Sequence, residues 1–84
     1  MAMEVERRAY DEMVDLFARG ATSADVLAFR PSEDAKERVR YLLARNGAGN
    51  LSEEEAAELN RFGELEQLMQ LVKARAQLYI ERRP

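Results

Sequence analysis

Apolar residues recur at helical spacing over three stretches of the chain. In the first stretch, residues 4–19, they lie three or four positions apart, at Val5, Ala9, Met13, Leu16 and Phe17. This spacing predicts an amphipathic helix with one buried stripe, which Tyr10 and Val14 widen. Gly20 follows and is expected to end the helix, because glycine adopts a positive φ without steric cost.

A short apolar segment, residues 24–29, separates this helix from the next one. Thr22 and Ser23 offer an N-cap before it, but so short a segment is not stable as a helix by itself. We therefore expect Val26, Leu27 and Phe29 to fill the core from a connecting turn.

The second helix is predicted to follow Pro31, which favours an extended backbone at the residue before it. Ser32 is the expected N-cap, and acidic residues in the first turn suit the helix dipole. The predicted buried stripe consists of Ala35, Val39, Leu42 and Leu43. Arg45 is expected to close the helix, because a glycine-rich turn, residues 46–50, comes directly after it.

The third helix has the clearest start signal in the chain. Ser52 and Glu55 form a capping box, with Leu51 before it, and no proline follows until Pro84. A helix over residues 52–83 is about 46 Å long, whereas a compact chain of this size is roughly 30 Å across. The helix is therefore expected to overhang, bend or pack on another molecule. Gly63 permits a bend or a close helix approach, and the sequence leaves open whether the helix bends there.

The second half of this long helix is apolar over a wide arc, which predicts more than one neighbour. The residues expected to form an interface are Leu65, Leu68, Leu71, Val72, Leu78, Tyr79 and Ile80. We predict a single all-α domain over residues 1–84, in which the second and third helices form a hairpin, the N-terminal helix packs on it, and oligomerisation completes the fold.

Composition limits the chemistry that the chain can perform. The 84 residues contain no cysteine and no histidine, so thiolate ligands and the usual general base are missing. The glutamates at positions 53–55 and 58 are interpreted as first-turn charges of a helix and not as a metal or acid–base cluster. We expect no catalytic residues, no cofactor and no metal. With neither a signal peptide nor a membrane-spanning run in the sequence, the expected location is the cytoplasm.

The distribution of charge does not favour direct binding to nucleic acid. The net charge is −3, and the bases of the second helix alternate with acids. An alternative function, a dimeric DNA-binding antitoxin or transcriptional regulator, requires a basic face built across a dimer. The candidate residues for that face are Arg7, Arg8, Lys36, Arg38 and Arg40.

Parts of residues 26–76 resemble a known family. The stretches that carry the likeness are Val26-Leu27-Ala28-Phe29-Arg30-Pro31-Ser32, Leu42-Leu43-Ala44-Arg45-Asn46-Gly47-Ala48-Gly49-Asn50-Leu51-Ser52-Glu53-Glu54-Glu55, Glu58-Leu59 and Leu71-Val72-Lys73-Ala74-Arg75-Ala76. They are similar to a family of short bacterial proteins of unknown function, common in cyanobacteria and often encoded beside small nucleases of the HNH or PIN type. The resemblance implies an antitoxin-like or accessory role.

The expected function is therefore protein–protein interaction, either as a homodimer or larger assembly or with a partner such as a neighbouring nuclease. Residues 53–66 carry six acids and one base, whereas residues 67–83 carry one acid and four bases. This asymmetry predicts that two copies of the long helix pair in antiparallel orientation.

Overall fold

The computed structural model describes the backbone of residues 2–82 and the side chains of residues 4–82. It contains four helices, α1 (Ala2–Ala18), α2 (Ser23–Ala28), α3 (Glu33–Gly47) and α4 (Glu53–Glu81), and no strand within the described residues. The prediction of an all-α chain is confirmed. None of the helices over residues 2–82 is both long and apolar enough to cross a membrane.

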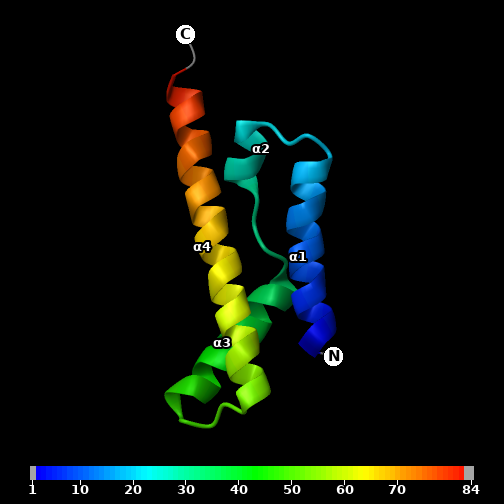
Figure 1. Cartoon of the computed structure of the whole chain (residues 1–84), viewed down its shortest axis with the longest axis vertical. Coiled ribbons are helices and arrows are strands. Elements are labelled where there is room, and N and C mark those ends of the chain that lie inside the picture. The colour runs from blue at the N-terminus through cyan, green and yellow to red at the C-terminus, as the bar shows by residue number, and fades with distance from the viewer. Residues whose placement is uncertain (1, 83–84) are drawn as a thin grey trace.

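The molecule is elongated, and α4 is its longest helix. Figure 1 shows α1 and α4 running in the same direction, with α2 and the segment after it between them. The C-terminal end of α4 extends past the other helices. The extents are 52 × 22 × 18 Å and the radius of gyration is 14.9 Å, against about 12 Å for a compact chain of this length. Of the three outcomes expected for the long helix, the structure shows the overhang.

The segment expected to be a connecting turn is a short helix, α2, with its own capping box. The Thr22 side chain accepts a hydrogen bond from the backbone N–H of Asp25, and the Asp25 carboxylate accepts one from the N–H of Thr22, both at 3.1 Å. This reciprocal pair satisfies two backbone donors that a helix end leaves free. Val26 is buried in the core, as predicted, and Leu27 and Phe29 pack around it.

The α3–α4 turn is set by one glycine and one capping box. The helix α3 runs to Gly47, two residues beyond the predicted end, and Gly49 then takes a φ of 74°. The N–H groups of Gly49 and Asn50 donate to the carbonyls of Asn46 and Arg45, at 3.0 and 2.9 Å, which is a Schellman motif. The predicted Ser52–Glu55 capping box is present, with both hydrogen bonds at 3.1 Å.

Two apolar clusters hold the helices together. The first contains Met13, Leu16, Val26, Met69 and Ala76, and joins α1, α2 and α4. The second contains Ala9, Ala35, Leu42 and Phe62, and joins α1, α3 and α4. Leu65 packs against both clusters. The helices α3 and α4 cross obliquely near the start of α4 (Figure 1), so α3 covers only that part of it.

Four residues predicted to be buried are exposed, namely Tyr10, Val14 and Phe17 on α1 and Leu43 on α3. Phe17, on α1, is adjacent to the buried Leu16, and Leu43, on α3, is adjacent to the buried Leu42. Successive helical residues point about 100° apart. In so small a fold, the other helices cover only a narrow strip of α1 and of α3. The second apolar residue of each pair lies outside that strip and is exposed to solvent.

Gly63 is neither a break in α4 nor a point of close approach. The helix is continuous from Glu53 to Glu81, and a Cβ at Gly63 would meet no atom within 4 Å. Replacing Gly63 with alanine should therefore stabilise the fold by about 0.5–1 kcal/mol, because glycine costs conformational entropy inside a helix. Urea denaturation measures this gain. A loss of stability would show instead that α4 bends at Gly63 in solution.

Candidate interaction surface

The buried side of α4 faces the three other helices. Glu58, Phe62, Met69 and Ala76 are its buried residues, at spacings of four and seven that keep them on one side of the helix. Two of the residues expected at an interface lie close to this side. Leu65 packs against both core clusters and Val72 against the first one, so each is half-buried by the chain itself.

A row of large apolar side chains lies on the other side of α4. We call it the outer stripe, and its members are Leu68, Leu71, Leu78 and Tyr79, which are 49%, 70%, 43% and 57% exposed. Leu68, Leu71 and Leu78 fall three and seven residues apart, which is the spacing of a coiled-coil seam. Ile80, the remaining predicted interface residue, is half-buried. The structure thus brings four of the seven predicted residues together on one open surface.

A second row of exposed apolar side chains lies on α1, and the sequence pattern did not predict its exposure. Tyr10, Val14 and Phe17 lie on α1 at spacings of four and three, and are 38%, 59% and 44% exposed. The pattern suggested that they extend the buried stripe of α1. In the fold, the core contacts of α1 come from Ala9, Met13 and Leu16.

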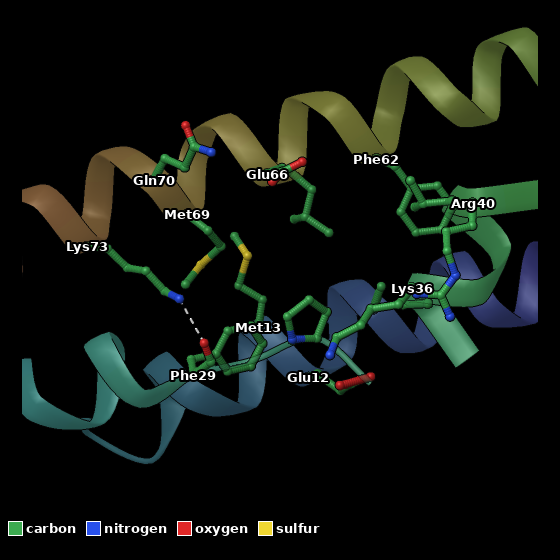
Figure 2. Close-up of a pocket in the computed structure, with 15 residues that line it drawn as sticks. Glu12, Met13, Phe29, Lys36, Arg40, Phe62, Glu66, Met69, Gln70 and Lys73 are labelled. Carbon is green, nitrogen blue, oxygen red and sulfur yellow. Dashed lines mark hydrogen bonds between the residues drawn. The ribbon is translucent and has the colours of Figure 1, made fainter. Parts of the chain in front are cut away.

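A groove of about 450 Å³ lies between α1, the start of α3 and the middle of α4 (Figure 2). Met13, Phe29, Phe62 and Met69 supply apolar surface, and the charged residues that line it are Glu12, Lys36, Arg40, Glu66 and Lys73. These charges are of both signs, so the groove does not select a strongly anionic or cationic ligand.

A hydrogen bond joins two of the residues that line this groove. The Lys73 ammonium donates to the Phe29 carbonyl at 2.8 Å, which ties α4 to the segment before Pro31 (Figure 2). Burial lowers the pKa of Lys73, and the nearby charge of Arg30 lowers it further. Arg30 donates to the same Phe29 carbonyl, at 2.8 Å. Both cations therefore anchor a backbone carbonyl at the exit of α2.

Three of the five basic residues considered for DNA binding are paired with acids. Their ion pairs are Arg8–Asp34 at 3.0 Å, Lys36–Glu33 at 3.2 Å and Arg38–Glu58 at 2.8 Å. Arg7 and Arg40 are exposed. Because a carboxylate beside a cation cancels much of its attraction for phosphate, these pairings weaken the case for a basic DNA-binding face.

The Arg38–Glu58 pair has a structural role that the sequence did not reveal. The Arg38 guanidinium donates two hydrogen bonds of 2.8 Å to the Glu58 carboxylate, which is buried between α3 and α4. The hydrogen bond to Glu58 raises the pKa of Arg38. The same guanidinium lies 4.9 Å from the centre of the Tyr41 ring. This fork-like pairing fixes how α3 crosses α4.

Replacing Arg38 with methionine should lower the free energy of unfolding by about 2 kcal/mol, because the buried Glu58 carboxylate loses a charged donor. Adding Glu58→Met to that variant should restore part of the loss, since no unpaired charge then remains buried. Chemical denaturation of both variants measures the difference. Equal stability of the native chain and Arg38→Met would contradict a structural role for this pair.

Glu55 acts as a helix-end charge of α4, as predicted, whereas Glu58 is buried against α3. Glu55 accepts from the Ser52 N–H and, at 3.2 Å, from the Arg45 guanidinium. The backbone hydrogen bond from Ser52 is the main reason that the pKa of Glu55 is lowered. This carboxylate is therefore committed to the turn between α3 and α4.

Comparisons with known proteins give no match for this chain. No protein-family model, no curated protein and no solved structure matches it.

Proposed function

We propose that this chain is a protein–protein interaction module that associates with itself through the outer stripe of α4. The observation that carries this proposal is the exposure of Leu68, Leu71, Leu78 and Tyr79 on one side of the longest helix. Clustered apolar surface of this kind is typical of an interaction site, whereas isolated exposed leucines are not. Covering it with a second helix removes apolar area from water, which is favourable by about 25 cal/mol per Å².

A second copy fits this surface because α4 is charged oppositely at its two ends. Residues 53–66 are acidic and residues 67–83 are basic, so antiparallel helices bring unlike charges together. Exposed ion pairs are each worth only about 0–1 kcal/mol, so they set orientation while the apolar contact supplies most of the affinity. The rest of the chain covers one side of α4, and the second copy covers the other side.

The family resemblance suggests that the self-associated chain also binds a different protein. A self-associated chain offers the α1 row, Tyr10, Val14 and Phe17, as a second surface. That row is where a further protein, such as a neighbouring-gene nuclease, could be held in an accessory or antitoxin-like assembly.

Sedimentation equilibrium tests self-association. The chain has a mass of 9.6 kDa, so a dimer has twice 9.6 kDa, or about 19 kDa. We expect the larger mass at micromolar concentration, with dissociation on dilution. A mass of 9.6 kDa that persists into the high micromolar range would contradict self-association through α4.

A further inference from the structure

We infer that two copies of α4 pair about a twofold axis midway between Leu68 and Leu71, with Glu64 of each copy facing Arg75 of the other. This arrangement rests on the proposed self-association and specifies the register of the second copy. In it, Leu68 of one copy packs on Leu71 of the other, and symmetry repeats that contact. Four leucines then form the centre of the interface.

The spacing along α4 is symmetric about this axis. Glu64 lies four residues before Leu68, and Arg75 lies four residues after Leu71. All four positions belong to one coiled-coil seam on the exposed side of the helix. A twofold rotation therefore places an acid opposite a base on each side of the leucine centre.

Glu64 and Arg75 are both available for this pairing. Both side chains are exposed, and neither forms an ion pair within residues 4–82. A parallel arrangement would instead set each Glu64 beside the other Glu64 and each Arg75 beside the other Arg75. Because like charges repel, the charges oppose parallel pairing and favour the antiparallel one.

The next position of the seam is compatible with the same register. Arg61 falls opposite Leu78 of the second copy, and Arg61 is already paired with Glu6 of its own chain. That ion pair neutralises the guanidinium. The alkyl part of Arg61 is then able to cover Leu78, since long basic side chains bury their stems on apolar surface.

Disulfide trapping tests the register directly, because the native chain has no cysteine. Two single variants, Glu64→Cys and Arg75→Cys, are oxidised separately and as an equimolar mixture, with Ala74→Cys and Glu64→Cys mixed as the matched control. A disulfide requires Cα atoms about 4.4–6.8 Å apart, so we expect roughly fivefold more linked dimer in the Glu64→Cys and Arg75→Cys mixture than in either variant alone or in the control. A mixed dimer keeps one native Glu64–Arg75 pair, so the interface is preserved.

Any other pattern of disulfide linking would contradict the register that places Glu64 opposite Arg75. Equal linking of each variant alone would indicate parallel helices, and stronger linking of Glu64→Cys with Arg82→Cys would indicate a different antiparallel register. Light scattering on the same reduced samples separates the two proposals. A dimer that does not link in the expected mixture overturns the register alone, whereas a monomer overturns self-association and the register together.

Discussion

Replacing Leu71 with glutamate should convert the self-associated chain to a folded monomer of 9.6 kDa. Leu71 is 70% exposed in the single chain, so the substitution leaves the core unchanged. In the proposed dimer both Leu71 side chains lie near the twofold axis, and the change puts two carboxylates into an apolar contact. Association should weaken about 100-fold or more, because each copy loses a buried leucine and buries a charge in its place. Light scattering gives the mass, and circular dichroism reports whether the helices persist.

Leu43→Glu is the matched control for this experiment. Leu43 is 53% exposed on α3, so the same chemical change is made at a solvent-facing leucine outside the outer stripe. We expect that variant to keep the mass of the native chain. If both variants become monomers, the loss follows from added negative charge and not from a contact at Leu71.

Replacing Leu42 with alanine should lower the free energy of unfolding by about 3–4 kcal/mol. Leu42 is 0% exposed and packs in the cluster that joins α1, α3 and α4. The loss combines the transfer of the side chain with the cavity left behind. A domain of this size has roughly 4–13 kcal/mol of stability in total, so a large part of it depends on this one side chain. Urea denaturation followed by circular dichroism measures the change.

The adjacent leucine provides the control for the Leu42 experiment. Leu43→Ala removes the same atoms from an exposed position one residue along α3, and we expect a change within about 0.5 kcal/mol. Equal losses at Leu42 and Leu43 would mean that α3 is rotated in solution from its orientation in this fold.

Local signals in the sequence predicted the helix ends well. The Ser52–Glu55 capping box and the stop at Gly20 each depend on residues within a few positions of one another, and both are present. The capping box of α2 was missed because Asp25, and not a glutamate, closes it across from Thr22. A shorter acidic side chain therefore performs the same task in a helix of six residues.

Contacts between distant segments could not be predicted in this way. Arg38 and Glu58 are 20 positions apart, and nothing in their local sequence distinguishes them from the solvent-exposed charges of their helices. Likewise, the wide apolar arc of α4 predicted more than one neighbour without showing which of its residues the chain itself covers. Only the packed fold separates Leu65 and Val72, which contact the core, from Leu71, which does not.

Self-association through the outer stripe is tested most directly by identifying which residues of a second copy contact it in solution. Isotope-filtered NOE spectroscopy on a mixture of ¹³C-labelled and unlabelled chains detects contacts between copies only. We expect intermolecular NOEs from the methyl groups of Leu68 and Leu71. Intermolecular NOEs from Val14 alone, or none at concentrations where the mass is that of a dimer, would contradict an interface on α4.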